Sequence, residues 1–574
     1  MVGTKAARLL LISDFNMEIM AGCLRSHPGG VVSSVQTAPF GQVMPVLSGS
    51  VDDGSCHVAL VWTRPESISD GYRRAKAFER VDVATVLAEV DLFAALLARH
   101  AEGVELLFVP TWVLPRSFVG HGLLEMQEGL GLTNLLMRMN LRLAERLAAV
   151  SNLYLLDAGR WFAATDALCF DPKMWYLAKV PFGSHVFKAA AHAVIAALIG
   201  LYGGSRKLIV LDLDNTLWGG IVGDDGWERL RLGGHDPEGE AFVDFQHALK
   251  NLTRKGVLLA IVSKNTEKIA LEAIAKHPEM VLKLDDFAGW RINWDDKAAN
   301  LLALTAELNL GLQSVVFIDD NPVERARVRD ALPEILVPEW PTSKMAYRTT
   351  LESLDCFAIP ALSTEDMERT QMYVAERQRQ QMRQTLDSLD DWLNRLEITV
   401  TVERFSASNR QRTAQLFNKT NQMNLTTRRL AEPQLAAWSE GEGRMLHIFR
   451  VADRFGSAGL TGIVSLECAG EVATVVDFIL SCRVMGKKIE ECMTRHVWEM
   501  AQASGAKRIV VRHLETPKNG PCLAFWQRSG FEQAAEDPHR FEWPVDRVYP
   551  APAHIQLLDG TSASTFQENN RGES

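Results

Sequence analysis

Short runs of apolar residues alternate with amphipathic stretches along the first part of the chain. In residues 1–203 the runs are LLLIS, VALVW, ELLFVP and LYLLD, and from 207 to about 362 they are LIVLD, LLAIVS and SVVFIDD. Buried strands that alternate with helices are typical of layered folds with parallel sheets. Since YGGSRK between the two series has the composition of a linker, the pattern predicts two α/β domains, 1–203 and 204–362. The second should contain a doubly wound parallel sheet.

The rest of the chain follows a different pattern. Residues 363–396 contain neither glycine nor proline and open with Ser-Thr-Glu-Asp, which predicts a long connecting helix capped near Ser363 or Thr364. The strand-like runs ITVTVERF, LHIFRV, GIVSLE and ATVVDFIL, with the helical NRQRTAQLFNKTNQ among them, predict an α+β domain over 397–545. Residues 546–574 are rich in Ser, Gly, Asn and Pro, so we expect a frayed tail there.

The composition is ordinary for a soluble globular protein, with 47% hydrophobic and 23% charged residues. A net charge of −10 at pH 7 argues against nucleic-acid binding, which needs a surplus of Lys and Arg. The eight cysteines include no Cys-x-x-Cys pair, so neither a zinc site nor a disulfide framework is indicated. The most apolar stretch is shorter than the ~20 residues of a membrane span, and the N-terminus has no signal-peptide core. We therefore expect a cytoplasmic protein without a nucleic-acid or membrane partner.

The segment VLDLDNTLWGG, residues 210–220, ends a buried strand with two acids. Side chains two residues apart on a strand point to the same side, so Asp212 and Asp214 should converge. Two such carboxylates repel each other and are costly to desolvate unless a cation lies between them. A hard divalent cation with oxygen ligands is the natural choice.

Polar residues also follow other strands of the middle domain. LLAIVS ends at Ser263-Lys264-Asn265, WDDK supplies Lys297, and SVVFI is followed by Asp319 and Asp320. The carboxyl ends of strands in an open α/β sheet border one crevice, so these groups should meet the first acid pair. Together they suit phosphoryl transfer, because acids can hold Mg²⁺, a hydroxyl and a lysine can hold phosphate oxygens, and one carboxylate can attack phosphorus. The short separations leave no room for a separate cap domain.

These residues and their order resemble the haloacid dehalogenase (HAD) superfamily of phosphotransferases. The resemblance implies that Asp212 is the nucleophile that forms an aspartyl phosphate and that Asp214 is the general acid and base. The implied phosphate-binding residues are Ser263, Lys264, Asn265 and Lys297. The implied Mg²⁺ ligands are Asp212, Asp214, Asp319 and Asp320.

A narrower resemblance covers nearly the whole chain. LDLDNTLWGGIVGDDG, VSKN, FIDDNPVERARVR, NKTNQMNLTTRR and DFILSCRVMGKKIE are together similar to the FkbH-like proteins, which load a glyceryl unit onto acyl carrier proteins in polyketide pathways. The resemblance implies an SGNH hydrolase-like domain at 1–203, a HAD-like phosphatase at 204–362 and a GNAT-like acyltransferase at 397–545. It also implies that 1,3-bisphosphoglycerate is the donor and that the phosphopantetheine thiol of an acyl carrier protein is the acceptor.

In the GNAT fold a splayed strand and a helix N-terminus receive a pantetheine arm and its phosphate. Arg483, Gly486 and Lys487 stand where that resemblance places pantetheine-binding residues, although the final small residue of the usual motif is missing. Cys482 precedes this basic loop, a setting that favours the thiolate, and we nominate it as the acyl-bearing thiol. A buried structural role for Cys482 fits the sequence equally well. Cys356, before the connecting helix, is a poorer candidate.

Other interpretations of the chain stay open. It could be a phosphatase acting on another phosphorylated small molecule or acyl phosphate, with a C-terminal domain that only binds, or a scaffold with inactive folds. The first strand ends at Ser13 without a Gly-Asp-Ser elbow, which favours a degenerate N-terminal domain over an esterase. The basic clusters at Arg410 and Arg412 and at Arg428 and Arg429 could orient an acidic carrier protein, although such clusters are usually solvated helix faces.

Overall fold

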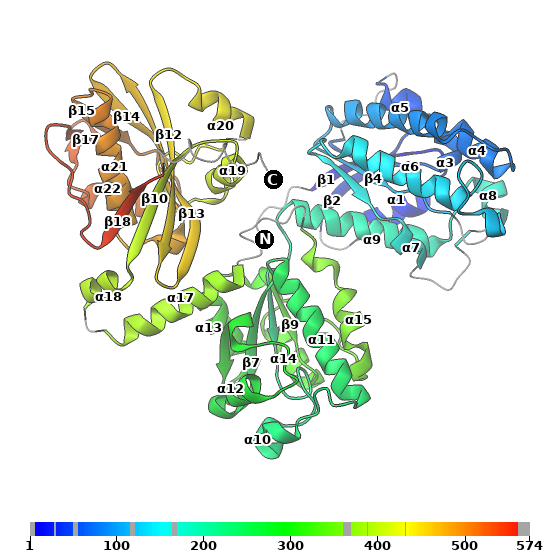
Figure 1. Cartoon of the computed structure of the whole chain (residues 1–574), viewed down its shortest axis with the longest axis horizontal. Coiled ribbons are helices and arrows are strands. Elements are labelled where there is room, and N and C mark those ends of the chain that lie inside the picture. Colours follow the sequence, from blue (N-terminus) through cyan, green and yellow to red (C-terminus); the bar gives the residue numbers. More distant parts are fainter. Residues whose placement is uncertain are drawn as a thin grey trace, which may run out of the picture. The chain divides into compact units, whose positions relative to one another are not determined.

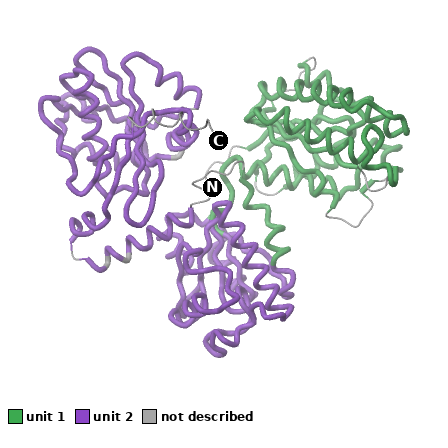
Figure 2. Tube along the Cα trace, in the orientation of Figure 1, with its two compact units in different colours: residues 1–207, 313–315, 348–362 green, residues 208–312, 316–347, 363–574 purple. Residues whose placement is uncertain are grey.

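A computed structural model describes residues 6–27, 30–49, 56–114, 121–163, 169–170, 172–359, 369–386, 388–430 and 432–560. The chain divides into two compact units, coloured separately in Figure 2. The first unit contains residues 1–207 with the short segments 313–315 and 348–362, and the second contains the remainder. The sequence placed 348–362 in the middle domain, but the contacts of this segment group it with the N-terminal unit. The mixed α/β fold class is confirmed.

The N-terminal unit contains a five-stranded parallel sheet in the order β2-β1-β3-β4-β5. Its strands are β1 Ala7–Ser13, β2 Val32–Thr37, β3 Val58–Trp62, β4 Leu106–Pro110 and β5 Leu153–Leu156. Helices α1 Glu18–Arg25 and α9 Ser184–Leu201 pack on one face, and α5 Val83–Ala101 and α6 Leu132–Leu147 pack on the other (Figure 1). Two apolar cores, one on each face, result from the buried runs that the sequence pattern marks.

Helix α9 is long and apolar enough to cross a membrane by length and composition, with a mean hydropathy of 1.5. Its buried positions include Val186, Phe187, Val194 and Leu198, which belong to the core cluster that α9 shares with α1 and the sheet. Since one side of the helix is packed into a core in this way, its apolar character has a structural explanation within the domain.

The middle domain is built on a four-stranded sheet in the order β8-β7-β6-β9. The strands are β6 Leu208–Leu211, β7 Leu258–Ser263, β8 Phe287–Ile292 and β9 Val315–Ile318. The helices after them include α11 Pro237–Arg254, α12 Glu267–Lys276, α13 Lys297–Glu307 and α14 Pro322–Ala331. Residues 213–236 and 264–286 contain only the short α10 Val222–Asp225, α12 and two 3-10 turns, so no separate cap domain lies in them.

The connecting region is two helices instead of the single one that the sequence predicted. Helix α17 spans Arg369–Gln384 and α18 spans Leu389–Arg395, where the hydroxyl of Ser388 caps the second helix by accepting from the Asp391 N–H. Their expected start near Ser363 lies outside the described residues. Within its unit, α17 packs against β8 and against β13 Gly456–Ala469.

The C-terminal domain has a strongly twisted sheet in the order β16-β17-β15-β14-β13-β12-β10-β18, and β11 pairs with β14 beside it. The strands other than β13 are β10 Ile398–Arg404, β11 Met423–Asn424, β12 Arg444–Asp453, β14 Val472–Leu480, β15 Arg508–Arg512, β16 Glu532–Ala534, β17 Asp537–Pro544 and β18 Ile555–Asp559. The helices are α19 Arg410–Lys419, α20 Glu432–Ser439, α21 Ile489–Ala503 and α22 Gly520–Arg528.

Part of the predicted tail is ordered. Strand β18 pairs in parallel with β10, and Tyr549 is buried in the core of the domain. The expectation of a frayed tail is therefore wrong for residues 546–560. Local composition suggested disorder there, but an edge strand needs only backbone pairing and one neighbour to be held.

Candidate active site

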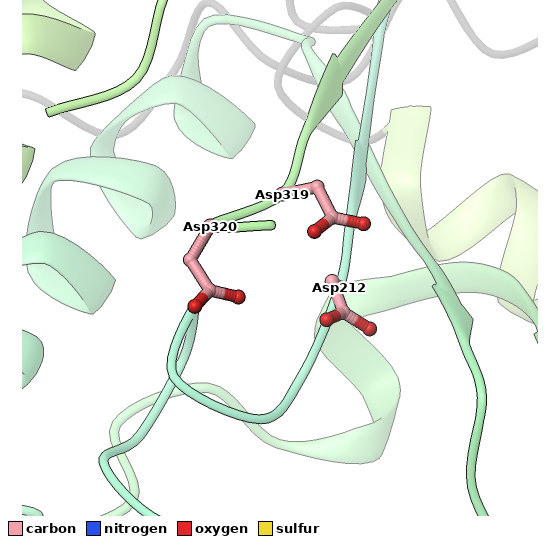
Figure 3. Close-up of side chains that lie close together, drawn as sticks. All are labelled: Asp212, Asp319 and Asp320. Carbon is pink, nitrogen blue, oxygen red and sulfur yellow. The ribbon is translucent and has the colours of Figure 1, made fainter. Parts of the chain in front are cut away.

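Three carboxylates meet at the carboxyl ends of β6 and β9. Asp212 directly follows β6, and Asp319 and Asp320 directly follow β9, which lies next to β6 in the sheet. One carboxylate oxygen from each residue lies within 4.8 Å of the others, and Figure 3 shows the three groups around one space. The Asp212 N–H donates to the Ile318 carbonyl at 3.0 Å, which holds the two strand ends in register.

Lys297 links two of these acids. Its ammonium lies 2.6 Å from Asp319 and 3.0 Å from Asp212, and its side chain is only 4% exposed. The lysine is the first residue of α13, so the helix start delivers it to the sheet edge. The three carboxylates outnumber the ammonium groups beside them, so the site has an excess of negative charge.

The carboxylate of Asp214 lies outside this cluster, although the sequence placed it among the metal ligands. It accepts hydrogen bonds from Trp218 Nε1 at 2.9 Å, from the Val222 N–H at 3.1 Å and from Asn265 Nδ2 at 2.8 Å. Alternation along a strand does not apply here, because β6 ends at Leu211 and Asn215 has a positive φ of 55°. The turn directs Asp214 toward the neighbouring loop instead of toward Asp319.

The other predicted phosphate-binding residues lie at the end of β7. Ser263 is buried as the last residue of that strand, and the side-chain amide of Asn265 donates a hydrogen bond to Asp214. The ammonium of Lys264 forms an ion pair with Glu324 of α14 at 2.6 Å. Of the predicted phosphate-binding set, Lys297 contacts the acid cluster, through its ammonium from the start of α13.

Burial dominates the electrostatics of the site. Desolvation, with the neighbouring charge of Asp212 second, raises the pKa of Asp319 to about 6. Desolvation also raises the pKa values of Asp214 and Asp320. The negative charge of Asp212 is a smaller cause of the raised pKa in all three residues, and a bound divalent cation would offset that charge. Oxygen ligands from three carboxylates are the donor set that Mg²⁺ accepts, so the residues present suit this ion.

Lys344 is a part of the site that the sequence analysis missed. Its ammonium donates to the Asn215 carbonyl at 2.9 Å and to the Tyr347 hydroxyl at 2.6 Å, and it lies 3.8 Å from Asp320. Lys344 follows no strand and stands in a segment, PTSKMAY, without any recognised motif. Only the tertiary structure brings it beside the turn that carries Asp214.

In the C-terminal domain, Cys482 begins a short 3-10 turn directly after β14 and is exposed. Arg483 donates to Ser481, Gly486 has a positive φ of 78°, and Lys488 is left-handed with a φ of 61° before α21. Cys356 differs, because burial raises the pKa of its thiol to about 12. Of these two thiols, Cys482 is the more exposed.

Lys487 is held inside the unit. Its ammonium lies 3.6 Å from Asp453 and 3.9 Å from Glu376 of α17, and its side chain is 6% exposed. Arg379 of α17 joins the same cluster with two hydrogen bonds to Asp453. These charges tie the loop after Cys482 to α17. A cavity of about 420 Å³ lies along this junction, lined in part by Met372, Tyr373, Ser481, Cys482 and Arg483.

The opening between β14 and β15 is filled by the chain itself. These parallel strands pair only from Val472 to Val475 on β14, and beyond this point β11 pairs with Ile479 and Leu480. The N–H of Leu425 donates to the Phe478 carbonyl at 3.1 Å, and the Leu425 carbonyl accepts from the Leu514 N–H at 3.0 Å. Residues 423–425 therefore bridge the two strands with backbone hydrogen bonds.

A buried carboxylate secures this bridging segment. Asp477 of β14 is fully buried and accepts from Thr426 at 3.0 Å, from Arg428 Nε at 2.9 Å and from Ser465. Arg429 donates to the carbonyls of Phe417 and Thr420. Both arginines of the second basic cluster thus hold the local fold together, which reduces what they can offer to a carrier protein.

No family model and no curated protein matches this chain. The chain is similar to the N-terminal part of a Bacteroides fragilis protein that contains a phosphatase domain and was crystallised with Mg. That likeness has 26% identity and a TM-score of 0.56, and it covers 62% of this chain and 95% of the other. Fold and site together define the class: a multidomain α/β protein, 62% of which is similar to part of a phosphatase-containing protein.

Two acetyltransferase structures overlap the C-terminal domain. They are the spermidine N-acetyltransferase of Vibrio cholerae, at 13% identity over 26% of this chain and 98% of that one, and the GNAT domain of S. lividans PAT, at 14% over 25% and 89%. Their TM-scores of 0.22 and 0.21 give no support by themselves. The description of the C-terminal domain rests on its own strand order and on the parallel β14–β15 pair.

Proposed function

We propose that this chain is a Mg²⁺-dependent phosphatase and acyltransferase, which takes a glyceryl unit from 1,3-bisphosphoglycerate and passes it to the phosphopantetheine thiol of an acyl carrier protein. The observation that carries the proposal is a set of three carboxylates, two of them buried and the third half-buried, around one space beside Lys297. The chain that contains this site is similar to a protein with a phosphatase domain. The donor and the carrier follow from the resemblance of the sequence to the FkbH-like proteins.

At the acid cluster, an oxygen of Asp212 attacks phosphorus and the bond from phosphorus to the substrate oxygen breaks. Asp214 donates a proton to the leaving oxygen, since burial raises its pKa and keeps it protonated more readily. It then takes a proton from the water that hydrolyses the aspartyl phosphate. Lys297 offsets charge on the moving phosphoryl group. Mg²⁺ held by Asp212, Asp319 and Asp320 would supply further charge stabilisation there.

The two phosphates of the proposed donor must be removed at two different sites, because they require different bonds to break. Attack on the phosphorus of an acyl phosphate releases a free carboxylate, which has no activation left for thioester formation. A thioester requires a thiolate to attack the carbonyl carbon, so that the carbon–oxygen bond breaks and inorganic phosphate leaves. We therefore assign the phosphate ester to Asp212 and the acyl phosphate carbonyl to Cys482. The glyceryl group stays on sulfur until the carrier thiol displaces it.

The carrier's arm is expected to reach Cys482 along the α17 side of the loop. Residues 423–425 occupy the opening between β14 and β15, where the GNAT resemblance would place a pantetheine chain. The cavity beside Met372, Tyr373 and Cys482 leaves space for a flexible arm, and its volume lies in the range of small-molecule sites. Arg483 at its wall suits the single phosphodiester of a carrier-bound arm.

The filled opening also favours a second candidate function. If the C-terminal domain receives no pantetheine arm at all, the chain is a phosphatase with a binding domain. Asp212, Lys297 and Asp319 would then act on a phosphate ester, and Cys482 would be an exposed thiol without a catalytic role.

One incubation separates the two functions. The full chain is mixed with Mg²⁺, enzymatically generated 1,3-bisphosphoglycerate and a phosphopantetheinylated carrier, and the carrier is weighed by intact mass spectrometry. The acyltransferase predicts a carrier heavier by one glyceryl group, dependent on Cys482, with release of both phosphates. A carrier of unchanged mass with phosphate release would leave only the phosphatase, and no phosphate release would refute both.

A further inference from the structure

The N-terminal unit contains an aromatic cavity of about 280 Å³ that the proposed function does not use. It lies at the carboxyl ends of β3 and β4, where Trp62 ends one strand before Thr63 and Arg64, and Thr111 and Trp112 follow the other. In a sheet of order β2-β1-β3-β4-β5, the connection after β1 leads to one side of that strand and the connection after β2 leads to the other side. The strand order therefore reverses between β1 and β3. The carboxyl ends beside that point are where open α/β sheets bind ligands.

The described residues that line the cavity include no serine or cysteine. Ser13 at the end of β1 accepts a hydrogen bond from the Phe15 N–H and is buried, and it does not line the cavity. The cavity walls are mainly rings, among them Trp62, Trp175 and Phe182. The chemistry of the lining therefore suits binding of an apolar body and offers no group for ester hydrolysis.

Two donors point to a specific ligand. Tyr72 is 1% exposed and lines the cavity, and no described residue forms a hydrogen bond with its hydroxyl. Burial raises the pKa of Tyr72, so the hydroxyl keeps its proton. A hydroxyl on the wall of the cavity is therefore available to donate to an acceptor on a ligand.

Arg64 supplies the second donor. Its Nε and its backbone N–H donate to the buried Asp14 at 2.7 and 2.9 Å, which fixes the guanidinium over the ring of Trp175 at 4.2 Å. Among the residues that the structure describes, none forms a hydrogen bond with either terminal nitrogen of Arg64. Two nearby hydroxyl oxygens already accept hydrogen bonds. Thr63 Oγ1 accepts one from Trp112 Nε1, and Thr111 Oγ1 accepts one from the Ala158 N–H.

Charge limits the head group. Asp14 compensates Arg64, and Glu66 pairs with Lys76 at 2.6 Å on the cavity wall. With these charges balanced, a phosphate dianion would add two uncompensated negative charges and a carboxylate only one. The planar guanidinium fork also matches the geometry of a carboxylate.

We propose that this cavity binds a small organic acid, with an apolar, preferably aromatic body against the tryptophans and a carboxylate on Arg64 and Tyr72. The N-terminal unit would thus be a ligand-binding module in a fold that the sequence relates to hydrolases. The size of the cavity restricts the ligand to roughly the dimensions of a phenylalkanoic acid.

The test uses the full chain and 3-phenylpropionate, with 3-phenylpropionamide as the matched neutral probe, in isothermal titration calorimetry. We expect saturable binding of the acid and at least about tenfold weaker binding of the amide. Tyr72→Phe should weaken binding of the acid about fivefold without loss of stability, because no described residue forms a hydrogen bond with the hydroxyl. Arg64→Lys keeps a charge for Asp14 but removes the fork, and should weaken it about tenfold.

Tyr176→Phe is the control. Tyr176 neighbours Trp175 on the chain, is 77% exposed and does not line the cavity, so its substitution should leave binding unchanged. Equal affinity for acid and amide would overturn the assignment of a carboxylate. Absence of saturable binding to the folded wild-type chain, or unchanged affinity in both cavity variants, would overturn the site.

Discussion

The Arg428–Asp477 ion pair is the best place to test whether residues 423–425 are locked in the sheet opening. Asp477 is fully buried, and Arg428 supplies two of its four hydrogen-bond donors. Arg428→Met would leave the carboxylate with only the hydroxyls of Thr426 and Ser465. Removing one partner of a buried pair costs about 3–5 kcal/mol, and since the Arg428 side chain is 29% exposed we expect the lower end, about 3 kcal/mol.

This loss should be visible in two assays. For a domain of this size it corresponds to a fall of roughly 6–12 °C in the melting temperature of the C-terminal transition. Hydrogen exchange should show faster exchange at the Leu425 and Leu514 amides, whose bonds bridge β14 and β15. Combining Arg428→Met with Asp477→Asn should cost less than the sum of the two single changes, because the uncompensated charge is gone.

Arg444→Met serves as the control, since Arg444 pairs with Glu467 at a site where both side chains are at least one third exposed. Such a pair contributes about 0–1 kcal/mol. If Arg428→Met destabilises the domain no more than Arg444→Met, the buried pair does not hold the segment and our account of the filled opening fails.

Three further outcomes are expected. Asp212→Asn should lower phosphatase turnover about a thousandfold or more while Asp244→Asn, on the exposed face of α11, leaves it unchanged; equal turnover in both variants would remove the nucleophile. Cys482→Ser should abolish the acyl-enzyme adduct in intact mass spectra, whereas Cys468→Ser should retain it. Burial raises the pKa of Glu490 to about 7, so the folded state binds its proton more tightly than the unfolded chain does. Stability should therefore fall by about 3 kcal/mol between pH 4.5 and pH 7, and denaturant titrations of Glu490→Gln should show this decline removed.

The sequence by itself determined where strands end and which polar residues stand there. Runs such as LIVL and VVFI are buried whatever their partners, so the acids that follow them had to lie at sheet edges. Parallel order then brought Asp212 and Asp319 together, as the pattern predicted. The absence of a cap domain in the middle domain likewise followed from chain length between strands.

Other features depended on contacts between distant segments. The turn after Leu211 directs Asp214 away from the acid cluster, and Lys344 reaches the site from a segment with no pattern of its own. Residues 423–425 fill the opening between β14 and β15. Strand β18 forms the edge of the sheet beside β10, although the composition of this segment predicted a frayed tail. The spacing of apolar residues predicts which face of a helix or strand is buried, because that spacing is a property of the local sequence. Which segment fills a given gap depends on long-range packing and backbone pairing, and only the folded chain decides that.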